Sequence, residues 1–426
     1  MSLNKVLKTT LLATALITSL NAIADDKIPD PFAQVRANAG VAPSAQAQGQ
    51  APAPIVLPEP PKFEAQSWVL MDYFSGRVIC EQNAHEKIWP ASLTKMMTAY
   101  VIGMELKSGR LHMEDDVTIT EDAWAKKYTD SSKMFIEVGK TIKVRDLVQG
   151  IIIQSGNDAC VAMAIHLAGT QEGFVSVMNN YAQQLGLKNT HFANVHGLFD
   201  EENYSTAYDM ALLGRATIRD LPNEYPLYSQ KEFSFNGIKQ MNRNRLLWDK
   251  SMNVDGIKTG HLSQVGYNLV TSATNDNMRL VAAVIGAKSE KLRADYNKAL
   301  LTYGFRYFQL YSPISSNKVL LTRDVRMGQS NKVDLAISKD LNILIPRGRQ
   351  SDIKLGYRLK KATFVAPIKK GDELGVVEVK IDNKIYDKVP LVAVQDIEEC
   401  GFFGKLWDRI CLFFSSDEEV VESAEG

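Results

Sequence analysis

Residues 90–106 read PASLTKMMTAYVIGMEL, an apolar run that carries three polar side chains, Ser92, Thr94 and Lys95, at its start. The apolar residues recur at helical spacing: Met96, Met97, Tyr100, Val101 and Met104. This spacing predicts an apolar helix over 91–106. Ser92 and Lys95 are three residues apart, so the helix would place them on one face, within reach of each other.

Strand-like runs lie on both sides of this helix in the sequence. They predict two hairpins, 67–81 around the turn Ser75-Gly76 and 268–285 around the turn 275–277. Further helices are predicted at 147–153 and 159–167. Strands at both ends of a region with helices between them predict an α+β domain, whose sheet is mostly antiparallel and covered by helices.

After residue 311 the sequence changes to short β-rich runs separated by turns. Examples are the runs 341–345 and 375–381, with turns at 346–348 and 382–384. This pattern predicts a small all-β domain over 309–397. The domain holds no residue cluster that indicates chemistry, so we expect it to serve in packing, spacing or contact with a partner.

The overall composition excludes several classes of protein. The chain has 426 residues, with 49 basic and 49 acidic side chains, so it lacks the net positive field that nucleic-acid binding favours. Four cysteines without a CxxC pattern are too few for a disulfide scaffold. The six histidines form no HExxH pattern, so nothing indicates zinc catalysis. No other metal and no organic cofactor is implied.

The N-terminus predicts export. A basic start and an apolar run over 11–20 precede the small-x-small site Ala22-Ile23-Ala24, which predicts a signal peptide over residues 1–24. An uncleaved membrane anchor is the alternative. Residues 25–63 are rich in Ala, Pro and Gln, a composition that cannot bury a core and predicts a flexible tether.

A segment near the C-terminus predicts where in the cell the protein is held. Residues 401–414 read GFFGKLWDRICLFF, with aromatic and aliphatic residues at helical spacing. We therefore predict an amphipathic helix over 398–416 that lies in the membrane interface. A helix packed on its own domain is the alternative. The acidic tail 417–426 counts against the membrane, because anionic lipid would repel it.

Three short polar motifs occur in order along the chain. They are Ser92-Leu93-Thr94-Lys95, Ser155-Gly156-Asn157 and Lys258-Thr259-Gly260. Patterns like these also occur elsewhere in the sequence, so their context decides. A lysine at the buried start of an apolar helix loses hydration, which lowers its pKa and lets it act as a base on Ser92. The helix N-terminus also offers N–H groups that stabilise a developing anion.

The second and third motifs suit substrate binding and proton transfer. Ser155 and Asn157 lie between two predicted helices, where a hydroxyl and an amide can relay a proton and bind a substrate. Lys258 lies between two glycines, which let another backbone approach, so a substrate peptide could add to this edge as a strand. Its ammonium would hold a carboxylate and depress the pKa of Lys95.

This ordered set resembles the penicillin-recognising serine enzymes. The segments PASLTKMMTAYV, IIIQSGNDACVAMA, FSFNGIKQMNRNRLLW and VDGIKTGH closely resemble the periplasmic D-alanyl-D-alanine carboxypeptidases, the low-molecular-mass penicillin-binding proteins. The resemblance covers about 64–414. It implies a β-lactamase/transpeptidase-like domain over 64–308, then the all-β domain and the anchor helix. It also implies a periplasmic protein on the outer face of the inner membrane; the tether and acidic tail depart from the family pattern.

By this resemblance, Ser92 attacks the penultimate D-alanine of a peptidoglycan stem pentapeptide, and Lys95 takes its proton. Ser155 relays a proton to the leaving D-alanine, and Asn157 holds the substrate amide. The other residues implied to bind substrate are Lys258, Thr259, Gly260, His261, Arg243, Arg293 and His196. The backbone N–H groups of Ser92 and His261 would form the oxyanion hole. β-Lactam antibiotics would acylate and inhibit the enzyme. For His196, a structural role in its loop is the alternative.

Two other functions stay open from the sequence. A β-lactamase shares the three motifs, but class A enzymes also need a glutamate to activate the deacylating water. The segment KNTHFANVHGL has no carboxylate until Asp200, and Glu201 and Glu202 come late in a polar turn. A non-catalytic cell-wall binding or sensor protein on the same fold is the second alternative. Carboxypeptidase and endopeptidase activity are not separated by these residues.

Overall fold

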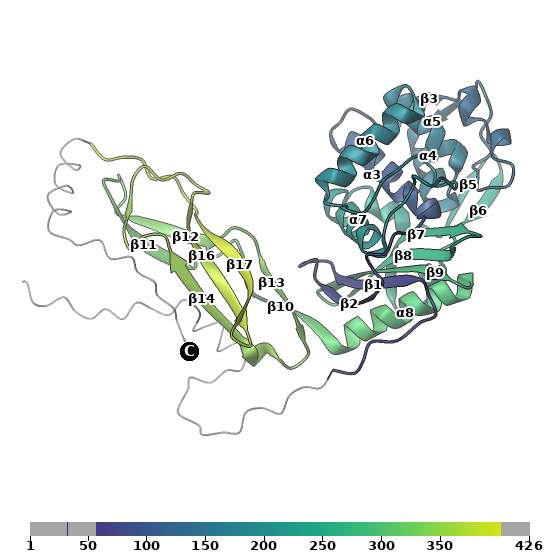
Figure 1. Ribbon diagram of the computed structural model, residues 1–426. Helices are drawn as coiled ribbons and strands as arrows, with labels where there is room; N and C mark the ends of the chain where they lie inside the picture. Colours follow the sequence, from purple (N-terminus) through teal and green to yellow (C-terminus); the bar gives the residue numbers. More distant parts are fainter. Residues whose placement is uncertain (1–31, 33–56, 402–426) are drawn as a thin grey trace, which may run out of the picture. The chain divides into compact units, whose positions relative to one another are not determined.

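The structure is a computed structural model that describes Phe32 and residues 57–401. The chain divides into two compact units (Figure 1). One comprises Ala51–Ser312 and Asn342–Arg349, and the other comprises Pro313–Leu341 and the chain from Gln350 onward. The predicted signal peptide, most of the predicted tether and most of the predicted amphipathic helix lie outside the described residues. Within 57–401, no helix is long and apolar enough to cross a membrane.

The first unit is built on a five-stranded sheet with the order β2-β1-β9-β8-β7. Its strands are β1 Ser67–Asp72, β2 Val78–Gln82, β7 Asn253–Leu262, β8 Gly266–Asn275 and β9 Met278–Ala287. Each neighbouring pair is antiparallel, and two of the pairs, β1–β2 and β8–β9, are the predicted hairpins. β9 pairs with β1, so strands from the beginning and the end of the unit's sequence lie side by side in the sheet.

Both faces of this sheet are buried, because side chains alternate between two separate apolar cores. On β1, Val69 and Met71 join one core, whereas Trp68 and Leu70 join the other. Successive side chains on a strand point to opposite faces, so a strand covered on both sides is apolar at every position. This explains why β9 has the nearly continuous apolar sequence MRLVAAVIGA.

Helices cover the two faces of the sheet unequally (Figure 1). A single long helix, α8, packs on one face, and α7 packs on the other with the remaining helices beyond it. The helices are α3 Thr94–Lys107, α4 Val144–Gln149, α5 Asn157–Ala168, α6 Gln171–Gln184, α7 Ala207–Asp220 and α8 Glu290–Tyr307. Side-chain caps begin three of them: Thr170, Thr206 and Ser289 accept backbone N–H groups at the starts of α6, α7 and α8.

Two small two-stranded antiparallel sheets also belong to the first unit. One pairs β3 Asp116–Thr118 with β4 Thr141–Lys143, and the other is the hairpin of β5 Glu232–Phe235 and β6 Ile238–Met241. The hairpin contributes to the site, because Gln240 Nε2 donates to the carbonyl oxygen of Lys133 at 3.3 Å. Gln240 therefore connects the β5–β6 hairpin to the segment that precedes α4.

The second unit is all-β. Its six-stranded sheet has the order β14-β16-β17-β12-β11-β15. The strands are β11 Leu321–Arg326, β12 Lys332–Ile337, β14 Ile353–Leu359, β15 Phe364–Val365, β16 Glu373–Ile381 and β17 Lys384–Ala393. A separate two-stranded pair, β10 Phe308–Ile314 with β13 Leu341–Pro346, falls mostly within the residue ranges of the first unit. The predicted turn at 382–384 is confirmed, since Asp382 and Asn383 both have positive φ between β16 and β17.

The predicted fold class is confirmed: a helix-covered antiparallel sheet is followed by an all-β domain. One local prediction needs refinement. Ser92 does not lie in the α-helix itself but in a 3-10 turn, Ala91–Leu93, immediately before α3. Likewise, the predicted helix 147–153 is α4 continued by a π-helical turn, Gly150–Gln154.

Candidate active site

Ser92 and Lys95 form a close, buried pair. Lys95 Nζ lies 3.0 Å from Ser92 Oγ and also donates to the carbonyl oxygen of His196. Only 1% of Lys95 is exposed. Loss of hydration lowers the pKa of Lys95 to about 8, and the positive charge of Arg243 acts in the same direction. A neutral amine is then available near neutral pH to accept the proton of the Ser92 hydroxyl.

Two glycines allow the backbone around Ser92 to be packed tightly. Gly197 has φ +82, and a Cβ there would lie 1.8 Å from the carbonyl oxygen of Ala91. On the other side, a Cβ at Gly260 would lie 3.1 Å from the carbonyl oxygen of Pro90 and 3.3 Å from the Leu93 nitrogen. The turn that carries the serine is therefore held between a loop and the edge strand β7, and neither glycine leaves room for a side chain without movement.

Ser155 has an unusual backbone conformation just before the start of α5. The π-helical turn Gly150–Gln154 ends at Ser155, which adopts the left-handed conformation with φ +66 and ψ +37. π-Helical turns and left-handed non-glycine residues both concentrate at functional sites. The Ser155 hydroxyl is buried and has no hydrogen-bond partner within the described ranges. It is therefore available to a substrate or to a transferred proton.

Asn157 connects the second motif to a neighbouring loop. Its backbone N–H donates to the carbonyl oxygen of Ser132 at 2.9 Å, and its Nδ2 donates to Ser131 Oγ at 2.9 Å. The next residue, Asp158, is buried and accepts the N–H groups of Met134 at 2.8 Å and Ile136 at 3.2 Å. The start of α5 thus holds the loop 129–135 beside the serine.

The third motif lies on β7, an edge strand of the sheet. Lys258 is 4% exposed, and burial, followed by the positive charges of Lys95 and Arg243, holds its pKa well below the usual range. Its Nζ donates to the carbonyl oxygen of Thr259 at 3.2 Å. Lys258 therefore lies behind the cavity wall, whereas Thr259, Gly260 and His261 line the cavity.

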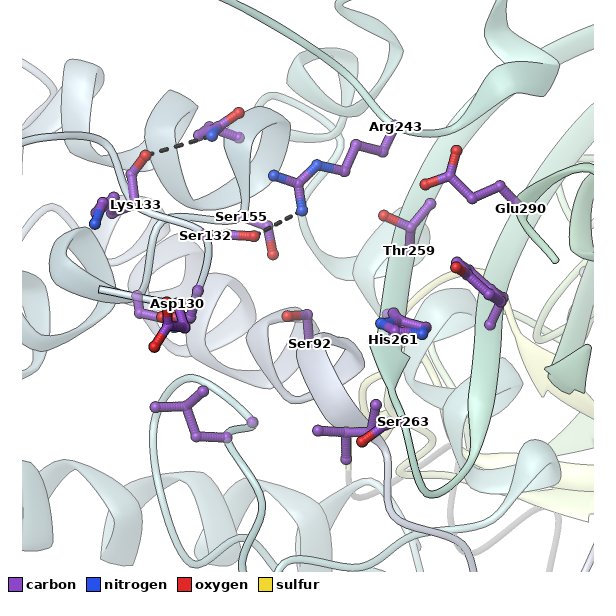
Figure 2. A pocket seen from close by; sticks show the side chains of 18 of the residues that line it. Ser92, Asp130, Ser132, Lys133, Ser155, Arg243, Thr259, His261, Ser263 and Glu290 are labelled. Carbon is purple, nitrogen blue, oxygen red and sulfur yellow. Dashed lines mark hydrogen bonds between the residues drawn. The ribbon is translucent and has the colours of Figure 1, made fainter. Parts of the chain in front are cut away.

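Arg243 and Arg293 form one cationic side of the site. Arg243 Nη1 donates to Ser132 Oγ at 2.6 Å, an interaction visible in Figure 2. Arg293, on α8, donates to the carbonyl oxygens of Gly260 at 3.2 Å and Arg243 at 3.4 Å. Burial lowers the pKa of Arg293 to about 10, while Glu290 opposes that shift. Arg293 thus connects the edge strand β7 to the backbone of Arg243.

His196 contributes its backbone rather than its ring. Its carbonyl oxygen accepts from Lys95, its Nδ1 accepts the Leu198 N–H at 3.2 Å, and its ring lies 5.9 Å from that of Tyr128. Burial, together with the charge of Lys95, lowers the pKa of His196 to about 3, so the ring is neutral at physiological pH. The predicted structural alternative fits these contacts, since the cavity is lined by Gly197 and Leu198 instead.

These elements surround a cavity of about 690 Å³ (Figure 2). The predicted site residues that line it are Ser92, Ser155, Asn157, Arg243, Thr259, Gly260, His261 and Arg293. The cavity is also lined by residues that the sequence did not predict: the loop 129–133, Phe135, Gln154, Gly197, Leu198, Leu262, Ser263, Tyr267 and Glu290. The loop is polar and contains two adjacent serines, but no sequence motif identifies it as part of a site. Its position depends on contacts with Asn157 and Asp158.

The carboxylates that line this cavity are Asp130 and Glu290. Glu201 and Glu202, the late carboxylates considered for a β-lactamase, line a different cavity together with Lys87 and Trp89. The structure therefore gives neither of them a position beside Ser92. Among the described residues, no group of three or more His, Cys, Asp or Glu side chains could hold a metal ion.

Comparison with known proteins gives a consistent result for both units. Residues 55–289 match a family described as D-alanyl-D-alanine carboxypeptidase, and residues 308–399 match the C-terminal domain of penicillin-binding protein 5. D-alanyl-D-alanine carboxypeptidase DacA of Escherichia coli K12 is 50% identical over 362 residues, which is 84% of this chain and 90% of that protein. DacC of the same organism is 46% identical over 359 residues, with the same two coverages. The structure of penicillin binding protein 5 from Haemophilus influenzae has a TM-score of 0.75 and 48% identity, and covers 80% of this chain and 99% of its own.

Proposed function

This chain belongs to the D-alanyl-D-alanine carboxypeptidase family and is a serine-type peptidase, and we propose that Ser92 is its nucleophile and Lys95 the base. The observation that carries this assignment is the 3.0 Å contact between Lys95 Nζ and Ser92 Oγ, made by a lysine whose pKa burial lowers to about 8. The resemblance inferred from the three motifs is confirmed at the level of family and activity.

The proposed reaction has two steps. Ser92 Oγ attacks the carbonyl carbon of the penultimate D-alanine while Lys95 takes the hydroxyl proton. The peptide C–N bond breaks, and the leaving amine of the terminal D-alanine receives a proton by way of the Ser155 hydroxyl. Water then cleaves the ester on Ser92, which releases the shortened stem peptide and returns a proton to the serine.

Other residues bind and orient the substrate in this proposal. Asn157 holds the substrate amide, and the Ser92 and His261 N–H groups stabilise the oxyanion. The terminal carboxylate lies toward Arg243 and Thr259, where the cationic side of the cavity favours an anion. Lys258 acts from behind the cavity wall, whereas Arg293 is largely buried but still lines the cavity. Arg293 supports Arg243 through its backbone carbonyl, and Lys258 adds positive potential beside Lys95.

A penicillin trapping experiment tests the nucleophile and separates it from the β-lactamase alternative. Benzylpenicillin should add once to the wild-type protein, with the adduct mapped by mass spectrometry to the peptide that contains Ser92. The Ser92→Ala protein should remain unmodified. The penicillin adduct should persist, since Glu201 and Glu202 line another cavity and neither can take the part of the glutamate that class A β-lactamases use to hydrolyse a β-lactam acyl-enzyme. Rapid turnover of the penicillin without a lasting adduct would instead favour a β-lactamase.

The location of the enzyme is also a proposal. Residues 1–24 are proposed as a signal peptide that directs the chain to the periplasm, and residues 25–63 as a tether. The amphipathic segment 398–416 is proposed to hold the enzyme on the outer face of the inner membrane. Fractionation of cells that express wild type or the double variant Trp407→Asp, Phe414→Asp tests the anchor. Loss of membrane association only in the variant supports it, and equal distribution contradicts it.

A further inference from the structure

The charged residues that line the Ser92 cavity are distributed unevenly. Arg243 and Arg293 lie on one side, and Glu290 pairs with Arg293 at 3.7 Å and with Arg245 at 3.4 Å. In the view of Figure 2, Asp130 lies across Ser92 from His261 and away from Arg243. The cavity therefore has a cationic region and, separately, an isolated carboxylate.

The Asp130 carboxylate is exposed to the cavity and available to a ligand. Among residues 57–401, no hydrogen bond or ion pair engages its oxygens, and its side chain is exposed. The nearby cation Lys133 is directed elsewhere: its Nζ donates to the carbonyl oxygens of Tyr128 and Thr129, at 3.1 Å each. The charge of Asp130 is thus left without a neutralising contact at the cavity wall.

The loop that presents Asp130 is held in place by its neighbours. Ser131 accepts from Asn157, and Ser132 accepts from the Asn157 backbone and from Arg243. Asp158 fixes the next residues of the loop through the Met134 N–H. A charged group on a supported loop binds at a lower entropic cost than one on a mobile loop.

We propose that Asp130 binds the side-chain ammonium of the residue that precedes D-Ala-D-Ala in the substrate, and so makes the enzyme prefer stem peptides with a free amine there. This inference rests on the proposed function, which places the terminal carboxylate toward Arg243 and the scissile carbonyl at Ser92. The preceding residue then continues past Ser92, away from Arg243, on the side where Asp130 lies. A carboxylate accepts hydrogen bonds only, whereas an ammonium offers three donors.

The test compares two synthetic peptides that differ by one charge. One is Nα-acetyl-Lys-D-Ala-D-Ala, and the other is its Nε-acetylated form, with D-alanine release measured at pH 7. For wild type, kcat/KM should be about 2- to 5-fold higher for the free-amine peptide than for the acetylated one, the range that exposed ion pairs give. In Asp130→Asn the ratio should fall to about 1. Glu137→Gln is the matched control, since Glu137 is an exposed carboxylate nearby that does not line the cavity, and the wild-type ratio should persist.

Ionic strength supplies a readout that a purely structural role of Asp130 would not affect. The wild-type ratio should decrease as salt rises from about 0.05 M to about 0.5 M, because salt screens exposed charges. Equal kcat/KM for both peptides in wild type would overturn the proposal. An Asp130→Asn enzyme that loses activity on both peptides by the same factor would also overturn it. Absence of release from either peptide by wild type would contradict the proposed function itself, and the inference with it.

Discussion

Lys95 Nζ lies 3.0 Å from Ser92 Oγ although almost no part of the lysine reaches solvent. A charged lysine buried this deeply is unfavourable, and hydration cannot be restored without opening the packing of α3. The same packing that buries α3 from Thr94 to Gly103 therefore lowers the pKa of the base. In this protein, the energetics of the core and the chemistry of the site depend on the same residues.

The pH dependence of acylation follows from this pair. Lys95 accepts a proton only when neutral, so kcat/KM should rise with pH through an apparent pKa of about 8 and level off above it. In Arg243→Gln, loss of a positive charge that lowers this pKa should move the rise to higher pH, in addition to weaker substrate binding. Acylation rates across pH 6 to 10 measure both effects. An unchanged midpoint in the variant would contradict the assignment of Lys95.

Ser155 should show opposite effects on stability and activity. Its left-handed backbone costs a non-glycine residue about 1 kcal/mol, so Ser155→Gly should unfold at higher urea concentration than wild type. The same change removes the proposed proton relay, and D-alanine release should fall by about 100-fold or more. Ser155→Ala is the matched comparison, since it loses the hydroxyl but keeps the backbone cost. A Gly variant no more stable than the Ala variant would refute the strain argument.

Gly197 should tolerate no side chain. A Cβ at this position would overlap the Ala91 carbonyl, so Gly197→Ala should lower the free energy of unfolding by about 3 kcal/mol and displace the turn that carries Ser92. Gly139→Ala is the control, because Gly139 has a similar φ of +78 and no atom within 4 Å of a Cβ. That control should lose only about 1 kcal/mol, the backbone cost alone. Chemical denaturation of both variants decides the comparison, and equal losses would contradict it.

Asp158 should act as the positioning residue of the loop 129–135. It accepts the Met134 and Ile136 N–H groups, and Asp158→Asn would replace one acceptor oxygen with a donor. We expect a loss of about 2 kcal/mol in unfolding free energy and a raised KM for the peptide substrate. Asp122→Asn removes an exposed carboxylate paired with Lys127 and should change stability by less than about 1 kcal/mol. An Asp158 variant with wild-type KM would show that the loop does not depend on it.

The parts of the fold that sequence analysis predicted correctly depend on local patterns. The hairpin β1–β2 and the hairpin β8–β9 follow from alternation and turn residues, and α3 follows from helical spacing. Ser92 and Lys95 are close because they are three residues apart on one helical segment. The pairing of β1 with β9 joins strands about two hundred residues apart in sequence. The sequence did not predict that pairing, because a contact between strands so far apart in the chain leaves no pattern in the local sequence.

What sequence analysis missed depends on tertiary contacts. The loop 129–133 carries no periodicity, and Asn157 and Asp158 bring it to the cavity from 22 to 26 residues further along the chain. The burial of Lys258 behind the cavity wall and of most of Arg293 was also not predicted, since a motif gives the residue type but not its exposure. For His196, substrate binding and a structural role in its loop were both predicted, and its ring contacts the ring of Tyr128.

The most direct test of the central assignment is D-alanine release from a peptide that ends in D-Ala-D-Ala, with wild type and Ser92→Ala compared at equal concentration. The variant removes only a hydroxyl from a turn held by its backbone, so circular dichroism should show both proteins folded. We expect release by wild type and none above background by the variant. Release that survives in a folded Ser92→Ala protein would show that the nucleophile is another residue.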